Sequence, residues 1–227
     1  MKSIRVISGC IGLLGMLCVG ITGSSYQAFG DVVVSSSPSP VNTGSSVQLS
    51  AQDQALSDQA QSWINNLSTL QAKFQQIAPD GQRSTGTVWI KRPGRIRFEY
   101  NKPSELLLVA NDGKMVFHDS EVGQTTTIPL DQSPLGLLLK PQLSFSGDVS
   151  ITNFMPPNNG LFQITVVRTA SPSDGSLTLI FNQNPLMLKA WRVVDAQGRI
   201  TMVDLYDLQP GVSVKNKLFK MDFGDNE

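Results

Sequence analysis

The alternation of apolar and polar residues at a period of two constrains the fold most. It recurs in short segments, and a period of two is typical of strands that bury one face. Turn signals separate several of the segments, such as "NDG" at 111–113, "DGS" at 174–176 and "DAQG" at 195–198. The predicted strands are 68–78, 84–92, 95–101, 105–110, 114–119, 124–130, 161–169, 177–183, 186–195 and 199–208. This pattern predicts a mainly β fold, an antiparallel sheet that curls or closes.

Two segments depart from this period. Apolar residues recur at helical spacing over 51–66 and indicate a helix with one apolar face, which Ser50 or Asp53 could cap. The second segment, "DQSPLGLLLK" at 131–140, is expected to form a short helix with Asp131 or Ser133 as its cap.

The N-terminus has the layout of a secretory signal peptide. Lys2 and Arg5 precede an uncharged apolar run at 11–21, and small residues at Ala28 and Gly30 suit cleavage after Gly30. The alternative is a membrane anchor, but a span needs about 20 apolar residues. We therefore expect 1–30 to be a cleaved signal peptide. Residues 31–50 are rich in Ser, Pro and Val and are expected to form a flexible leader before a domain at 51–227.

Both cysteines, Cys10 and Cys18, lie within this signal segment. Lipidation of Cys18 would require a small residue where Leu17 stands, and Arg5 interrupts the apolar region before Cys10. The mature chain is therefore expected to contain no cysteine and no disulfide. It would carry 16 basic and 18 acidic residues, because cleavage removes two of the 18 basic residues.

The sequence contains no recognisable motif for catalysis, for metal binding or for nucleotide binding. We therefore expect that the protein is not an enzyme and that it has no metal site and no cofactor. The lone histidine, His118, falls in a predicted strand and is interpreted as an ordinary residue. Basic and aromatic residues interleaved over 95–100 could bind single-stranded nucleic acid. A slightly acidic, exported chain argues against that function.

The stretch "GTVWIKRPGRIRFEYNKP" at 86–103 is predicted to be a hairpin with Pro93 and Gly94 in its turn. Alternation places Arg92 at the end of an apolar row, whereas Arg95 and Arg97 fall in a polar row. We expect Arg95 and Arg97 to be solvent-facing charges on an exposed strand.

Several motifs occur together in the order and spacing of one family. They are "LSTLQAKFQQ" (67–76), the hairpin at 86–103, "LLLVANDGKMVFHDSEVGQTTTIPL" (106–130) and "SPLGLLL" (133–139). The set resembles the LolA family of periplasmic carriers of outer-membrane lipoproteins, over residues 52 to 223. In addition, "NKLFKMDF" (216–223) is similar to the family's last strand region.

The resemblance implies an incomplete, strongly curved antiparallel β-barrel covered by an α-helical lid, made here of 51–66 and 131–140. Acyl chains of lipoproteins would enter between sheet and lid, and Arg92 and Pro93 would form the motif that keeps the empty lid closed. The candidate acyl-binding residues are Leu70, Phe74, Val88, Ile90, Ile96, Phe98, Tyr100, Leu106, Leu108, Met115 and Phe117. The candidate lid residues are Leu56, Trp63, Ile64, Leu135 and Leu138.

The implied partners are outer-membrane lipoproteins as cargo, an inner-membrane ATP-driven transporter that loads it, and an outer-membrane receptor or the outer membrane itself. The carrier would work in the periplasm as a monomer, without nucleic acid. Ile96 and Phe98 stand where aromatic pairs are common in the family, and His118 stands where a tyrosine is frequent.

Three other functions stay open. A periplasmic lipid- or glycolipid-binding or sensing module could use the same fold without lipoprotein cargo. The outer-membrane receptor of the pathway shares the fold but needs a lipidated N-terminal cysteine. An exported enzyme would need a catalytic motif.

Overall fold

The computed structural model describes residues 47–221, which include the predicted strands and helices. The predicted signal peptide at 1–30 and the leader up to residue 46 lie outside the described residues. The leader's last residues are described, and the Val47 amide donates to the carbonyl of Ile151 at 3.1 Å. Within 47–221, no helix is long and apolar enough to cross a membrane.

The N-terminal helix forms where the helical spacing predicts it. Helix α1 spans Ala51–Asn66, and the Ser50 hydroxyl accepts a hydrogen bond from the Asp53 amide at 3.2 Å. Of the two candidate caps, Ser50 is therefore the N-cap, and its oxygen satisfies one of the free amides of the first turn. Leu56, Ala60 and Ile64 are buried on one side of the helix.

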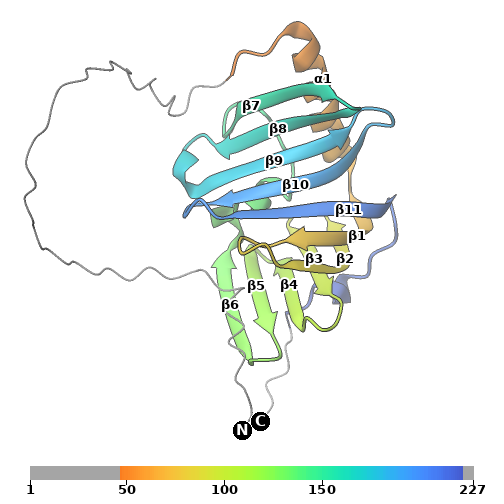
Figure 1. The fold of residues 1–227 in the computed structure, drawn as a ribbon, viewed down its shortest axis with the longest axis vertical. Coiled ribbons are helices and arrows are strands. Elements are labelled where there is room, and N and C mark those ends of the chain that lie inside the picture. The colour runs from red at the N-terminus through yellow and green to blue at the C-terminus, as the bar shows by residue number, and fades with distance from the viewer. Residues whose placement is uncertain (1–46, 222–227) are drawn as a thin grey trace, which may run out of the picture. The chain divides into compact units, whose positions relative to one another are not determined.

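Eleven strands form one antiparallel sheet (Figure 1). They are β1 (Thr69–Ile77), β2 (Arg83–Lys91), β3 (Arg95–Tyr100), β4 (Leu106–Asn111), β5 (Lys114–Asp119), β6 (Gln124–Pro129), β7 (Val149–Asn158), β8 (Leu161–Arg168), β9 (Gly175–Asn182), β10 (Met187–Asp195) and β11 (Ile200–Pro210). Their order is β6-β5-β4-β3-β2-β1-β11-β10-β9-β8-β7, so β6 and β7 are the two edges and the sheet is open. Strands β7–β10 run in a clearly different direction from β4–β6, which shows how strongly the sheet curls (Figure 1). The mainly β, half-barrel prediction is confirmed.

The main hydrophobic core lies on one face of this sheet, which we call the inner face. Leu70, Val88, Ile90 and Ile96 are among its side chains, and it packs against α1 and the segment after β6. A smaller cluster lies on the opposite, outer face around Val109. The period-two alternation therefore separates two faces, both of which are partly covered.

The segment predicted as a short helix at 131–140 forms two 3₁₀ turns instead, η1 (Leu130–Gln132) and η2 (Pro134–Leu137). Ser133 separates them, and its hydroxyl accepts from the Leu135 amide at 3.3 Å. Pro134 starts η2, where its missing amide hydrogen costs nothing. We call α1 and residues 130–145 together the lid.

The structure adds one strand to the prediction. Edge strand β7 escaped prediction because Pro156 and Pro157 interrupt its sequence pattern. Prolines are tolerated there because an edge strand leaves one side of its backbone unpaired. Within the stretch 216–223, which is similar to the family's last strand region, Asn216–Phe219 forms a 3₁₀ turn, η4, and residues 222–223 lie outside the described residues.

Candidate functional site

Arg92 follows directly after β2, on the inner face at the end of α1. Its side chain is buried, and Nη1 donates to the carbonyl oxygen of Ile64 in the last turn of α1. Nη2 donates to the carbonyl oxygen of Lys140 at 2.6 Å and to Oδ1 of Asn65 at 3.4 Å. One guanidinium therefore bridges the two parts of the lid and ties both to the sheet.

The three hydrogen-bond acceptors of Arg92 within residues 47–221 are all neutral, so none of them forms an ion pair with the guanidinium. The C-terminal end of a helix carries partial negative charge, and α1 has no basic residue in its last turn. Arg92 supplies that cation from the sheet. Burial lowers the pKa of the Arg92 guanidinium below its usual value.

The hydrogen bonds of Arg92 hold the lid, but burial of the guanidinium costs part of its hydration free energy. Within 47–221, Nε of Arg92 is buried without a hydrogen-bond partner. A buried charge held only by neutral groups loses hydration that its hydrogen bonds replace in part. Arg92 therefore stabilises the contact between sheet and lid less strongly than the number of its hydrogen bonds suggests.

The turn after Arg92 adds a backbone contact to the lid. The Gly94 amide donates to the carbonyl oxygen of Leu139 at 2.9 Å. Gly94 has a φ of +77°, in the region that favours glycine, as the Pro93-Gly94 prediction requires. The Arg92 and Gly94 contacts with the lid lie only two residues apart in the chain.

Two amide side chains of α1 join the halves of the lid. Asn65 donates through Nδ2 to the Leu143 carbonyl and accepts through Oδ1 from the Leu143 amide, both at 2.8 Å. Gln61 accepts from the Phe145 amide at 2.7 Å. Sequence reasoning missed both residues, because nothing in the sequence marks a helix amide as the partner of a loop that follows 78 or 84 residues later.

A second arginine reaches the lid from the other half of the sheet. Nη2 of Arg168, at the end of β8, donates to the carbonyl oxygen of Ser133 at 2.9 Å. Sequence reasoning missed this residue too, since Arg168 ends an alternating strand like many surface arginines. The lid segment between η1 and η2 is therefore held by the sheet at a point distinct from Arg92.

The residues predicted to bind acyl chains share the inner face in register. Cross-strand pairing aligns Val88 with Phe98, Phe98 with Leu108, and Leu108 with Phe117. Eight are buried in the main core: Leu70, Phe74, Val88, Ile90, Ile96, Phe98, Leu108 and Met115. Tyr100 and Leu106 are half-buried, and Phe117 is 41% exposed. The inner face therefore becomes more exposed at the end of the strands where Tyr100, Leu106 and Phe117 lie, whereas Met115 on the same strand as Phe117 is buried.

The candidate lid residues lie over this face. Leu56, Ile64, Leu135 and Leu138 are buried in the main core, and Trp63 is half-buried against it. The Trp63 ring meets Phe181 of β9 edge to face, with centroids 5.9 Å apart. Lid side chains therefore occupy the space over the inner face.

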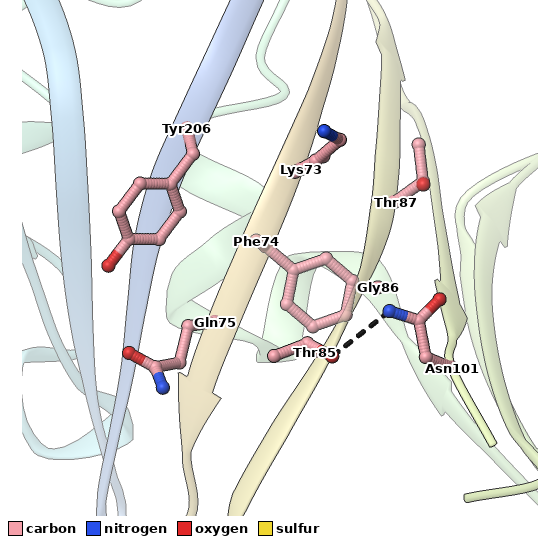
Figure 2. Close-up of a pocket in the computed structure, with 8 residues that line it drawn as sticks. All are labelled: Lys73, Phe74, Gln75, Thr85, Gly86, Thr87, Asn101 and Tyr206. Carbon is pink, nitrogen blue, oxygen red and sulfur yellow. Dashed lines mark hydrogen bonds between the residues drawn. The ribbon is translucent and has the colours of Figure 1, made fainter.

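An aromatic cluster fills the centre of the inner face. Phe74 contacts Phe98 and Tyr100 edge to face, with centroids 5.0 and 5.1 Å apart. Gly86 makes room for it, because a Cβ at Gly86 would lie 2.7 Å from Cε1 of Phe74 and 2.1 Å from the carbonyl oxygen of Glu99. Figure 2 shows the Phe74 ring beside Gly86.

A groove of about 490 Å³ lies over β1, β2 and β11 (Figure 2). Polar residues at outer-face positions, among them Lys73, Thr87 and Tyr206, line it together with Phe74 and Gly86, and its lining surface is part polar and part apolar. Lys73 pairs with Asp207 at 2.7 Å beside it, with both side chains largely exposed. Polar and charged side chains such as Lys73 and Asn101 set this groove apart from the apolar inner face.

The prediction for Arg95 and Arg97 is right about the face of the sheet but wrong that these charges face only solvent. They do lie on the outer face, but Arg95 donates to Asn216 Oδ1 at 3.1 Å and Arg97 donates to the Leu218 carbonyl at 3.3 Å. Arg97 also pairs with Glu99 at 2.9 Å. These charges hold the C-terminal segment instead of facing solvent alone.

His118 occupies an outer-face position of β5, and its Nδ1 lies 2.9 Å from Oγ1 of Thr125 on β6. Residues 47–221 contain no group of three or more histidine, cysteine, aspartate or glutamate side chains that could hold a metal ion.

Comparison with known proteins adds a second line of evidence. Residues 65–222 match the model of a family described as outer membrane lipoprotein carrier protein LolA. An outer-membrane lipoprotein carrier protein of Methylococcus capsulatus is 28% identical over 167 residues, which cover 70% of this chain and 79% of that protein. An outer-membrane lipoprotein carrier protein of Leptothrix cholodnii is 31% identical over 168 residues, which cover 70% of this chain and 77% of that protein. A solved LolA superfamily protein from Nitrosomonas europaea, 11% identical, covers 73% of this chain and 98% of its own, with a TM-score of 0.41.

Proposed function

Because the chain belongs to the LolA family of outer membrane lipoprotein carrier proteins, we propose that it carries outer-membrane lipoproteins through the periplasm. Their acyl chains would bind between the inner face and the lid. The protein would act as a carrier and not as an enzyme, since binding and release of cargo require no bond to be made or broken.

One observation supports this function above the others. Arg92 connects the sheet to both parts of a lid that lies over an apolar face. A lid fixed only by apolar packing would have no defined point of release. A lid held by a buried cation on neutral carbonyls can open when cargo or a partner replaces those contacts.

The free energy gained by burying an acyl chain and the free energy lost by opening the lid are of the same order. Burial of a sixteen-carbon chain could contribute roughly 12 kcal/mol, at ~0.8 kcal/mol per methylene group. Opening the lid exposes large buried side chains such as Leu56, Ile64 and Leu138, at about 1.5–3 kcal/mol each. Lid opening thus offsets much of the gain from cargo and keeps binding reversible, below the ceiling of ~20 kcal/mol.

The exposed end of the inner face offers a route of entry. Phe117 is exposed on the same cross-strand row as the buried Phe98 and Leu108. An acyl chain could contact this apolar edge first and then displace the lid. We propose that entry begins at Phe117 and proceeds along the inner face beneath the lid.

Loading and delivery would need partners with opposite tasks. An inner-membrane ATP-driven transporter would supply the energy to open the lid and insert the acyl chains. An outer-membrane receptor, or the outer membrane itself, would accept them by binding them more strongly. Residues 1–30 would direct export as a cleaved signal peptide, with 31–50 as a leader before the carrier domain at 51–227.

The experiment that tests this function is the identification of bound cargo. The full chain is expressed with its export signal, purified from periplasm without detergent, and analysed by native mass spectrometry. We expect triacylated or diacylated lipoproteins bound one to one. Phospholipid or glycolipid alone, with no lipoprotein, would instead favour the lipid-binding module.

A further inference from the structure

The C-terminal residues 212–221, which we call the strap, cover part of the outer face. Val214 and Phe219 are buried against Val109 of β4, and Trp89 of β2 packs beside them. The strap thus has an apolar anchor on strands β2 and β4. It lies on the face opposite the lid.

Charged donors from the β2–β3 hairpin fix the strap above this anchor. Nζ of Lys91 donates to the Val214 carbonyl at 3.0 Å and to Oδ1 of Asn216 at 2.7 Å. Arg95 donates to the same Oδ1 at 3.1 Å. Hydrogen bonds from charged donors are the stronger class, so Asn216 is a shared acceptor that holds both ends of the hairpin turn.

Lys91 and Arg95, which bind the strap, flank the turn residues that bind the lid. Lys91 and Arg95 are paired across β2 and β3 and enclose a turn of three residues. Within that turn, Arg92 donates to Ile64 and Lys140 of the lid, and the Gly94 amide donates to Leu139. One short turn is therefore held by the strap on the outer face and by the lid on the inner face.

We propose, on the premise that the lid gates acyl binding as above, that the strap is a positioning element for the lid clamp. Asn216 fixes Lys91 and Arg95, and this fixes the direction in which Arg92 and Gly94 leave the sheet. Arg92 must meet carbonyls from two separate lid segments at once, so a small rotation of the turn breaks at least one of them. Releasing the strap shifts the lid toward its open state.

Hydrogen exchange measured by mass spectrometry on the full chain tests this coupling. The peptide 138–146 reports on the lid, because its Leu143 and Phe145 amides are bonded to α1. Asn216→Ala is expected to speed its exchange about five-fold, as part of the energy of two charged hydrogen bonds is transmitted to the lid. Asn216→Asp, which keeps an acceptor for both cations, is expected to restore wild-type protection.

The matched control is Asn101→Ala. Asn101 is also an exposed asparagine of this hairpin, but it bonds Thr85 Oγ1 at 3.0 Å at the opposite end. Its loss should leave peptide 138–146 unchanged. Lys91→Gln is a second test variant, which removes the charged donor and leaves the strap sequence intact. It should also speed exchange of the lid peptide.

Unchanged exchange of 138–146 in both Asn216→Ala and Lys91→Gln, or equal acceleration in Asn101→Ala, overturns the coupling. Arg92→Leu is measured beside them to separate the two claims. If Arg92→Leu accelerates the lid peptide and the strap variants do not, the strap has no role and the lid clamp stands. If Arg92→Leu also leaves the peptide unchanged, the clamp in the proposed function fails as well.

Discussion

The guanidinium of Arg92 donates to the carbonyl oxygen of Ile64, at the C-terminal end of the helix that covers the sheet. Arg92 is the last residue of the apolar row formed by Val88 and Ile90, and Ile64 lies in the last turn of α1. This contact joins a helix end to a strand end. The position of the helix in the lid therefore depends in part on the hydrogen bonds of one buried guanidinium.

The first prediction concerns Arg92 itself. Arg92→Leu removes the donors to Ile64 and Lys140 but also removes a buried charge, so global stability should change by less than about 1.5 kcal/mol. The lid should open more often, and affinity for the fluorescent fatty acid cis-parinaric acid should rise about ten-fold. Arg92→Lys keeps the charge but has fewer donors in fixed geometry, so its fatty acid affinity should lie between those of the wild type and Arg92→Leu.

Fluorescence titration and urea unfolding of the three proteins check this order. Equal affinities for the fatty acid in all three would show that Arg92 does not hold the lid.

The second prediction uses Asn65, whose substitutions should loosen the lid to different degrees. Asn65→Ala loses both hydrogen bonds to Leu143. Asn65→Asp also loses the donor to the Leu143 carbonyl, but it keeps the acceptor and places a carboxylate near Nη2 of Arg92. The same titration should show tighter fatty acid binding for Asn65→Ala than for Asn65→Asp. The account is contradicted if Asn65→Asp binds the fatty acid more tightly than Asn65→Ala.

The third prediction concerns the open end of the inner face. Phe117→Gln should change stability by no more than about 0.5 kcal/mol, because the side chain is exposed. It should slow fatty acid association several-fold if entry begins there. Val122→Gln is the matched control, as Val122 is an exposed apolar residue in the turn after β5. Stopped-flow fluorescence measures both rates, and equal rates would rule out entry past Phe117.

The fourth prediction tests the close approach at Gly86. An added Cβ would collide with the Glu99 carbonyl and the Phe74 ring. Gly86→Ala should therefore destabilise the fold by about 1–3 kcal/mol, because backbone and core must shift. Urea unfolding measures this change, with Thr87→Ala on the outer face as the control. An unchanged midpoint for Gly86→Ala would mean that the sheet is less tightly packed there.

Local chemistry made much of the fold predictable. The Asn-Asp-Gly turn was visible in the sequence, and Asp112 and Gly113 adopt the positive φ values of 49° and 74° that such hairpins use. The helix at 51–66 was predictable from its spacing and cap. Strand β7 was not, because two prolines break its pattern and only its place at the sheet edge allows them.

The candidate site was predictable only in part. Alternation singled out Arg92 as the basic residue on an apolar row, and the family resemblance suggested the lid. The strap could not be foreseen, since Arg95 and Asn216 are 121 residues apart and nothing local marks them as partners. Arg95 and Arg97 looked like solvent charges because a strand pattern shows which face a residue takes but not what covers that face.

The central claim is that acyl chains bind between the inner face and the lid. It is tested by photo-crosslinking with p-benzoylphenylalanine in place of Tyr100, which is half-buried on the inner face. The matched control replaces Tyr206, an exposed tyrosine of the outer face. With a lipoprotein carrying radiolabelled palmitate as cargo, the account predicts labelled crosslinks from position 100 and none from position 206. Crosslinks from position 206 with none from position 100 would contradict it.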